Sequence, residues 1–160
     1  MKGDDKVIEY LQKGLHSEHT AISQYMVHAR KLEDWGINGL AQKERHEAMD
    51  EMRHLDRFLE RILFLEGEPD MQTLDPLRIG ADIRELLEND RAAEADALAL
   101  YREAMAHCES VRDYASRDLF GELLRDEEGH YDFLDTELQL IEDMGLENYR
   151  QSRMTAAPAE

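Results

Sequence analysis

Two copies of the pattern Glu-x-x-His are the residues of this chain best suited to metal chemistry. Glu51 and His54 form the first copy, and Glu127 and His130 form the second. Residues three apart share a face of a helix, so the carboxylate and the imidazole of each copy can bind the same ion. One such pattern arises easily by chance in an acidic chain with seven histidines. Two copies in matched surroundings are far more specific and indicate a metal site.

The surroundings match because the chain contains an internal repeat with a period of 76 residues. Five residues recur at identical intervals: Glu18, Tyr25, Asp50, Glu51 and His54 return as Glu94, Tyr101, Asp126, Glu127 and His130. In each half the second glutamate lies 33 residues after the first. Two helix hairpins related by a pseudo-twofold axis would bring the glutamates and histidines together at the middle of a bundle.

The chemistry expected of this cluster is that of a dinuclear metal centre. Its expected ligands, which are also the expected catalytic residues, are Glu18, Glu51, His54, Glu94, Glu127 and His130. Four carboxylates balance two divalent ions, and oxygen and nitrogen ligands without thiolate favour iron or manganese, although zinc can compete. Glu51 and Glu127 would bridge the ions, each histidine would bind one ion, and the other glutamates would be terminal ligands.

Two interpretations of the neighbouring residues stay open. Tyr25 and Tyr101 either hydrogen-bond the metal-binding carboxylates or are ordinary core tyrosines. His46 and Asp50, four residues apart on one helix face, form either a weak iron site on an inner surface or a solvated polar pair. We expect the remaining histidines His16, His28 and His107 to lie at the surface, because they show no interpretable pairing.

Four long helices must position these residues. Apolar side chains recur every three or four positions over residues 4–35, 38–66, 82–109 and 111–144, and a short helix is expected over 146–153. Each expected ligand lies in one of these apolar seams, and Asn38 is an expected helix cap. The sequence therefore predicts one all-α domain over 1–160. It is a ferritin-like four-helix bundle with a long crossover between helices 2 and 3 and a short C-terminal fifth helix.

Composition narrows the range of functions. The net charge of -18 argues against binding nucleic acid. No apolar run is long enough to predict a membrane span, and the first residues do not resemble a signal peptide. The single cysteine, Cys108, excludes an internal disulfide framework and a metal centre of four thiolates. A cytoplasmic location is the expectation that follows.

Much of the chain resembles bacterioferritin. The resemblance rests on the stretches MKGDDKVIEYLQK, ISQYMVHARKLEDWG, DEMRHLDRFLERILFLEGEP and RDEEGHYDFLDTELQLIEDMGLENY, and it extends through Tyr149. It implies a homo-oligomer, a 24-subunit shell around a ferric mineral, with b-type haem at the twofold interfaces between subunits. It also implies that Met52 is the axial ligand of the haem. Arg45 and His19 depart from the family, in which an aromatic and an aliphatic residue are expected.

The function implied by this resemblance is iron storage and detoxification. The chain would act as a ferroxidase that binds two iron ions per subunit and oxidises Fe(II) with dioxygen or hydrogen peroxide. A small ferredoxin is a possible reductant for iron release. Two alternatives remain: a di-iron oxidase or peroxidase that stores no iron, as in rubrerythrin-like proteins, and a helical assembly protein whose glutamates and histidines are structural.

Overall fold

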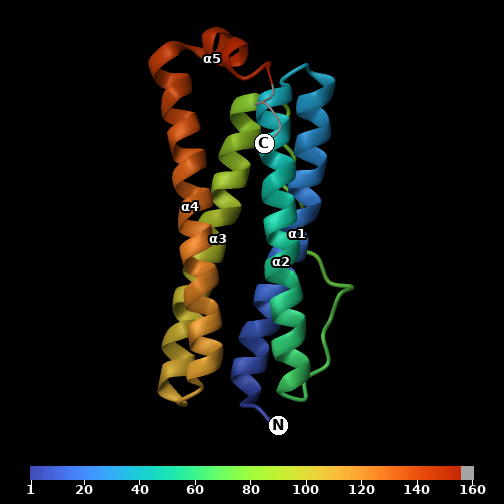
Figure 1. The fold of residues 1–160 in the computed structure, drawn as a ribbon, viewed down its shortest axis with the longest axis vertical. Helices are drawn as coiled ribbons and strands as arrows, with labels where there is room; N and C mark the ends of the chain where they lie inside the picture. Colours follow the sequence, from blue (N-terminus) through green and yellow to red (C-terminus); the bar gives the residue numbers. More distant parts are fainter. Residues whose placement is uncertain (156–160) are drawn as a thin grey trace.

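The fold is an all-α bundle of four long helices, with a short fifth helix across one end (Figure 1). The computed structural model describes residues 1–155. The helices are α1 (Asp5–Asp34), α2 (Asn38–Phe64), α3 (Ile83–Ser110), α4 (Tyr114–Met144) and α5 (Leu146–Ser152). The hairpins α1–α2 and α3–α4 pack together chiefly through α1 and α3, and no strand occurs among residues 1–155. The predicted bundle with a long crossover and a short C-terminal helix is confirmed.

Aspartates begin three of the four long helices. Asp4, Asp82 and Asp113 each accept hydrogen bonds from backbone amides of the first turn that follows them. Each cap satisfies amides that lack a partner inside the helix and places a negative charge near the positive end of the helix dipole. The apolar pattern predicted that the fourth helix begins at residue 111. The cap at Asp113 explains why α4 begins at Tyr114 instead.

The start of α2 depends on a distant segment. Asn38 is the first helical residue and no side chain caps this end, so the expectation that Asn38 is the cap is wrong. The amide of Gly39 instead donates to the carbonyl of Arg153 at 2.8 Å. At its other end α2 stops at Phe64, two residues before the predicted end at 66, because Glu66 adopts a positive φ of 63° that helices exclude.

Two apolar clusters lie on either side of the level that contains the expected metal ligands. One cluster contains the rings of Phe58, Tyr101 and Phe120, whose centroids lie 5.4, 5.6 and 5.8 Å apart. The other, nearer α5, contains Leu87 and Leu134. Burying such side chains stabilises the fold by about 25 cal/mol per Å², so these clusters fix the spacing of the helices. No helix within residues 1–155 is long and apolar enough to cross a membrane.

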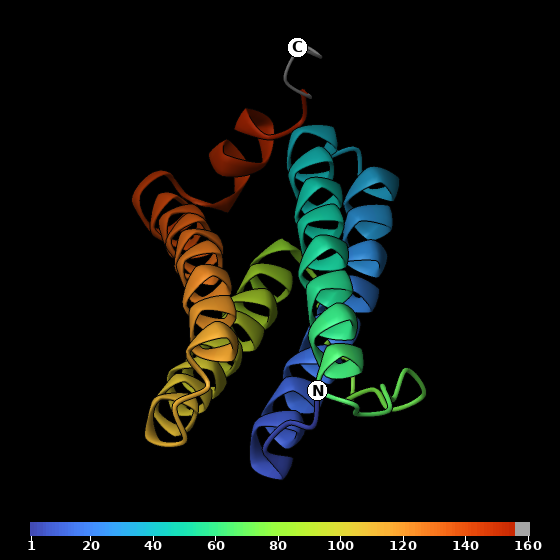
Figure 2. The same cartoon turned by 60° about the horizontal axis from the view of Figure 1, so that its bottom comes forward.

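α5 crosses the end of the bundle and connects its two hairpins (Figure 2). Tyr149 is fully buried, and its hydroxyl donates to Glu137 of α4 at 2.5 Å. The guanidinium of Arg153 donates twice to the same carboxylate, at 2.7 and 2.9 Å. Arg150 reaches the carbonyl of Trp35, just after α1, at 3.3 Å. Arg153 thus neutralises the charge of Glu137. The backbone carbonyl of Arg153 also accepts the hydrogen bond from the amide of Gly39 at the start of α2.

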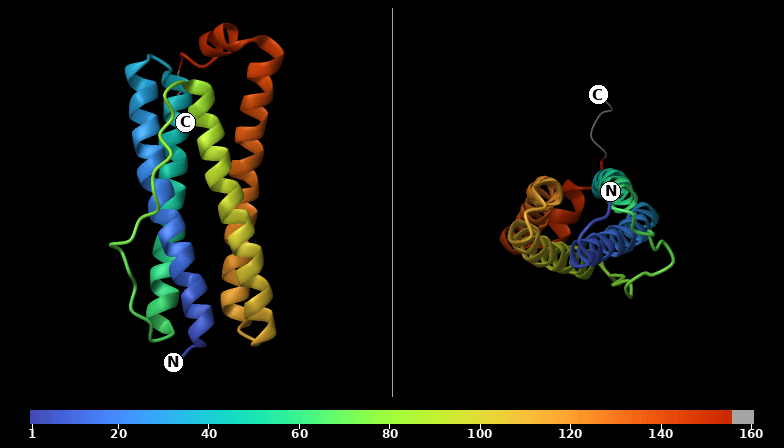
Figure 3. Two further views of the ribbon diagram at one scale, coloured as in Figure 1. Left: turned by 180° about the vertical axis from the view of Figure 1, so that it is seen from behind. Right: turned by 90° about the horizontal axis from the view of Figure 1, so that it is seen from below.

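The crossover, residues 65–82, runs along the outside of α1 for most of the length of the bundle (Figure 3). It contains no helix or strand. Most of its side chains are exposed, whereas Gly80 near its end is buried. Several of its backbone amides therefore take partners from outside the segment, and four of these partners lie on α1.

Gly14 shows how closely α1 approaches α2. A Cβ atom at Gly14 would lie 2.5 Å from the ring of Phe58, which is fully buried among other rings. We expect Gly14→Ala to lower the free energy of unfolding of the metal-free protein by about 1–3 kcal/mol, because the packed ring cannot move aside without strain. Urea unfolding followed by circular dichroism measures this change.

Gly129→Ala on α4 is the matched control. A Cβ atom there meets nothing within 4 Å, and alanine favours a helix over glycine by about 0.5–1 kcal/mol. We expect this variant to be slightly more stable than the unmodified chain. If Gly14→Ala proved as stable as Gly129→Ala, close packing would not be the reason for the glycine in α1.

Candidate metal centre

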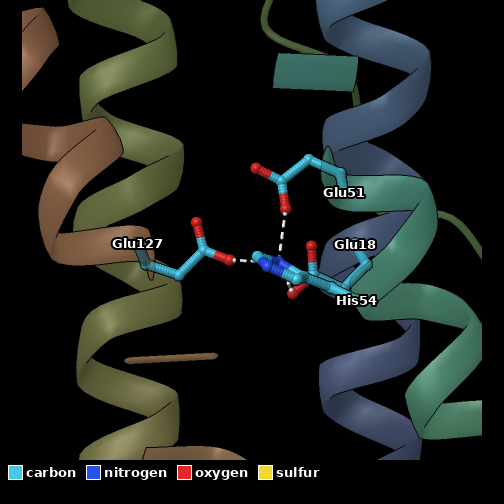
Figure 4. A group of neighbouring side chains, drawn as sticks. All are labelled: Glu18, Glu51, His54 and Glu127. Atoms are coloured by element: carbon cyan, nitrogen blue, oxygen red, sulfur yellow. Dashed lines mark hydrogen bonds and ion pairs between the residues drawn. The ribbon is translucent and has the colours of Figure 1, made fainter. Parts of the chain in front are cut away.

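The six expected ligands converge at the middle of the bundle from all four long helices. One set of neighbours is Glu18, Glu51, His54 and Glu127 (Figure 4). The other set is Glu51, Glu94, Glu127 and His130. Within each set the ligating atoms lie within 4.8 Å of one another. Because both sets contain Glu51 and Glu127, they describe two adjacent sites that share two carboxylates.

In the first set, His54 points one ring nitrogen at three carboxylates. Its Nδ1 lies 3.0 Å from an oxygen of Glu51 and 2.9 Å from an oxygen of Glu127. Glu18 supplies a third oxygen at 3.5 Å. One nitrogen and three oxygens thus surround a point where a cation can replace the proton between them.

His130 repeats this arrangement in the second set. Its Nδ1 lies 2.9 Å from Glu51 and 3.0 Å from Glu127, and Glu94 is the third neighbour at 3.9 Å. The rings of His54 and His130 are stacked, with centroids 6.2 Å apart and planes 19° apart. The repeat in the sequence therefore appears in space as a pseudo-twofold arrangement of ligands.

Further carboxylates hold the outer nitrogens of both rings. Nε2 of His54 lies 3.2 Å from Asp126. Nε2 of His130 lies 2.6 Å from Glu47, with Asp50 more distant at 3.9 Å. A carboxylate behind a histidine fixes the orientation of the ring and makes the inner nitrogen a stronger metal ligand.

The two repeated tyrosines contact the centre across the interface between α1 and α3. Tyr25 of α1 donates its hydroxyl to Glu94 of α3, and Tyr101 of α3 donates to Glu18 of α1. Burial, and then the nearby carboxylates, raise the pKa of both phenols well above the ordinary value. Both hydroxyls therefore keep their protons and act as hydrogen-bond donors to the carboxylates.

Protons balance much of the negative charge of the centre. Burial, followed by the charge of Glu51, raises the pKa of Glu18 to about 8. Burial also raises the pKa of Glu94 well above its ordinary value. For His54 and His130, burial lowers the pKa, but hydrogen bonds to the carboxylates outweigh it and the pKa of each ring is raised. A metal ion that binds here must displace these protons.

Two other expected sites lie outside this centre. Met52 on α2 is 46% exposed, and its neighbour Met49 is 51% exposed. Nε2 of His46 lies 3.5 Å from Asp50, and the His46 side chain is 61% exposed. Among residues 1–155, His46 joins no group of three side chains placed to hold a metal ion.

A second buried polar cluster was missed by the sequence analysis. His28, Glu44 and Asp90 are buried and have ligating atoms within 4.8 Å of one another, so the expectation that His28 lies at the surface is wrong. Glu47, which contacts His130, was also missed. One signal could have found the α2 residues, because Glu44 and Glu47 precede Glu51 at spacings of three and four that continue one helix face.

Two openings lead to the centre. The smaller, of about 70 Å³, is lined by Asp75 and Arg78 of the crossover and reaches the four expected carboxylate ligands. The larger, of about 500 Å³, is lined by both histidines and by Asp126 and Arg125 of α4. Ions and small oxidants therefore have access to the ligands without the bundle coming apart.

A four-helix bundle with paired Glu-x-x-His motifs and two further inward glutamates is a ferritin-like architecture, and residues 8–144 match the family described as "Ferritin-like domain". "Bacterioferritin" of Rhodobacter capsulatus is 52% identical over 160 residues, which are 100% of this chain and 98% of that protein. "Bacterioferritin" of Brucella melitensis is 50% identical with the same coverage. "Bacterial ferritin" of Synechocystis is 44% identical over 97% of this chain and 100% of that protein. The chain belongs to the bacterioferritin family.

The buried protons predict how stability depends on pH. The pKa of Glu18 is about 8 in the folded chain against an ordinary 4.5, so the folded state binds more protons across that interval and stability falls as pH rises through it. The raised pKa values of His54 and His130 act in the same direction above pH 6.5. We expect the metal-free protein to lose at least about 1 kcal/mol of unfolding free energy between pH ~6 and ~8.

Urea unfolding at the two pH values measures this loss, and repeating it with excess Zn(II) is the control. We expect the dependence to reverse in the presence of metal, because the ion then competes with the protons and binds better as pH rises. Equal stability of the metal-free protein at both pH values would show that the centre does not hold these protons.

Proposed function

We propose that the chain stores and detoxifies iron by oxidising Fe(II) to Fe(III) at this centre. The observation that carries the proposal is the pair of ligand sets that share Glu51 and Glu127. Each set offers carboxylate oxygens and one imidazole nitrogen, which are donors that suit iron. Membership of the bacterioferritin family supports the same function.

The proposed ligand roles follow from the contacts. Glu51 and Glu127 approach both histidines and would bridge the two ions. His54 and His130 would each bind one ion through Nδ1, after losing the proton held there. The two tyrosine-bonded glutamates, Glu18 and Glu94, would be terminal ligands, and their hydrogen bonds would fix the carboxylate orientation.

Fe(II) is the substrate of the proposed reaction. Two Fe(II) ions give one electron each, and dioxygen takes both electrons and two protons to become hydrogen peroxide. If hydrogen peroxide is the oxidant, it takes two electrons and two protons to become two water molecules. The protein holds the two ions side by side, balances their charge and leaves positions open for the oxidant.

Storage requires an enclosed volume, and we propose the homo-oligomeric 24-subunit shell that the family resemblance implies. The net charge of -18 favours the accumulation of cations near the chain. His46 and Asp50 stay a predicted weak iron site on the inner surface of this shell, where the ferric product would be deposited.

We also propose a b-type haem as cofactor, which Met52 would hold as axial ligand at a twofold interface between subunits. The residues present fit this group, because the thioether of Met52 is accessible and Met26, Val27 and Met49 are exposed apolar side chains. Each of two subunits would contribute one Met52. When bound, the haem would supply an electron-transfer group for reductive iron release, with a small ferredoxin as the proposed reductant.

Anaerobic titration of metal-free protein with Fe(II), followed by rapid mixing with oxygen, tests the centre. We expect a fast change in absorbance that saturates at about two irons per chain. Glu51→Ala and Glu127→Ala should each abolish the fast phase, because each removes a carboxylate common to both sites. Glu128→Ala is the matched control and should retain it, since Glu128 lies on the bundle surface beside Arg102.

Three outcomes separate the alternatives. Oxidation no faster than in buffer, and unchanged by the variants, would reject the catalytic proposal and leave the six residues a structural role. Fast oxidation by a monomer or dimer that accumulates no mineral would favour a di-iron oxidase or peroxidase without storage. Slow oxidation that continues beyond two irons per chain, in an assembly of 24-subunit size, would support storage.

Met52→Leu tests the haem proposal separately from the iron centre. We expect haem per chain, measured from the Soret absorbance, to fall at least about tenfold because the axial bond is lost. The fast oxidation of Fe(II) should be unchanged. Met49→Leu, at a neighbouring exposed methionine, should keep its haem, and haem retention in both variants would contradict the assignment of Met52.

A further inference from the structure

One stripe of polar side chains fixes the crossover to α1. Gln12, His16, Thr20, Gln24 and His28 follow one another at intervals of four residues, so each lies close to the next and together they form a stripe that winds slowly around the helix. Crossover amides donate to four of them at 3.0 to 3.1 Å: Asp70 to Gln12, Asp75 to Thr20, Arg78 to Gln24 and Gly80 to His28. The stripe supplies the partners that a segment without helix or strand lacks.

Two members of the stripe also reach inward to one buried carboxylate. Nε2 of Gln24 donates to Oδ1 of Asp90 at 2.7 Å, and Nδ1 of His28 lies 2.8 Å from Oδ2. Because Nε2 of His28 accepts from the amide of Gly80, the ring carries its proton on Nδ1, which donates to Asp90. Asp90 is 1% exposed and orients both side chains at once.

Glu44 is the third acidic or histidine side chain of this buried cluster. It is fully buried, and no hydrogen-bond donor among residues 1–155 reaches either of its oxygens. Burial, and then the charge of Asp90, raise the pKa of Glu44 well above its ordinary value, which favours the protonated carboxyl group. Both nitrogens of His28 are already in use. The hydrogen bonds that connect this cluster to the crossover therefore run from Asp90 through Gln24 and His28.

The network ends at the wall of the smaller opening to the metal centre. Asp75 and Arg78 of the crossover line this passage together with Gln24, and the carboxylate ligands lie at its inner end. The guanidinium of Arg78 forms an ion pair with Asp96 of α3 at 2.6 Å. The position of Arg78 therefore helps to set the width of the passage, and the backbone of Arg78 is held through Gln24 by Asp90.

The repeat provides an internal comparison. Shifted by 76 residues, Gln24, His28 and Glu44 correspond to Leu100, Ala104 and Phe120, and Asp90 corresponds to Gly14. The region related by the repeat lies beside the matching set of expected ligands but packs the apolar side chains of Leu100, Ala104 and Phe120. Within residues 1–155, no connection between helices runs along α3. The buried polar network thus occurs only in the repeat-related region that the crossover covers, although both regions have the expected ligands.

We propose that Asp90, through Gln24 and His28, is a positioning residue that holds crossover residues 75–80 as the outer wall of the passage taken by Fe(II). The effect on the capture of Fe(II) rests on the proposed ferroxidase function, whereas the effect on the position of the crossover does not. Asp75 presents a carboxylate at this passage that attracts the divalent substrate, whereas Asp96 is paired with Arg78. Loosening the wall displaces the Asp75 carboxylate and weakens capture of Fe(II), while the ligands themselves stay in place.

Asp90→Asn tests the proposal with little change of shape. Asparagine must turn its NH2 group towards one of the two donors, so one hydrogen bond is lost. In the metal-free protein, we expect hydrogen exchange over residues 77–81, followed by mass spectrometry, to quicken about tenfold. The Fe(II) concentration that half-saturates the fast phase should rise about threefold or more, with the rate at saturation unchanged.

Two further variants make the test specific. Gln12→Leu is the matched control, because Gln12 holds the far end of the crossover and lies outside both the passage and the Asp90 network. It should quicken exchange near Asp70 and leave the half-saturating Fe(II) concentration unchanged. Gln24→Met, which keeps the length of the side chain but removes both of its hydrogen bonds, tests the same link if Asp90→Asn does not fold.

Unchanged exchange over residues 77–81 in the folded Asp90→Asn and Gln24→Met variants would overturn the proposal. A lower rate at saturation with an unchanged half-saturating concentration would also overturn it, because Asp90 would then act on the metal centre. Failure of the proposed ferroxidase function would give a different result from failure of the role proposed for Asp90. An unmodified protein that oxidises Fe(II) no faster than buffer rejects the ferroxidase, and the exchange measurement still decides whether Asp90 holds the crossover.

Discussion

The burial of six ionisable side chains at one level of a helical bundle is the constraint on which the rest of the structure depends. A buried charge without a partner costs several kcal/mol, so these groups must neutralise one another or bind cations. Each histidine Nδ1 therefore faces three carboxylates, and two tyrosine hydroxyls donate to the outer glutamates. The apolar clusters on either side supply the stability that this polar level does not.

The internal repeat makes the ligands nearly equivalent, but their supports differ. Behind His54, the side chain of Asp126 is 57% exposed, whereas behind His130 the side chain of Glu47 is 3% exposed and also pairs with Lys43. A buried carboxylate holds a histidine more firmly than an exposed one, because water competes less for the hydrogen bond. The two proposed metal positions, with matched ligands, would therefore differ in how tightly they hold an ion.

The repeat also explains which residues sequence reasoning could find. The helices and the six central side chains follow from apolar periodicity and from residues that recur at 76-residue intervals. Glu44, Glu47 and Asp90 have no polar counterpart in the other half, where Phe120, Leu123 and Gly14 occupy the matching positions. A search guided by repetition passes over them. The start of α2 at Asn38 was predicted correctly, but its partner was missed for another reason: the amide of Gly39 donates to a carbonyl more than a hundred residues away.

The asymmetry around the centre follows from topology. α2 and α3 are joined across most of the length of the bundle, so one connection must run along an outer face, and it runs along α1 (Figure 3). Its amides require acceptors, and α1 supplies Gln24 and His28 at positions where the equivalent face of α3 has Leu100 and Ala104. Those polar side chains reach into the interior and need a buried partner, Asp90. The nearly symmetric site proposed for the metals thus has one polar flank, and the smaller opening to its expected ligands lies on that side.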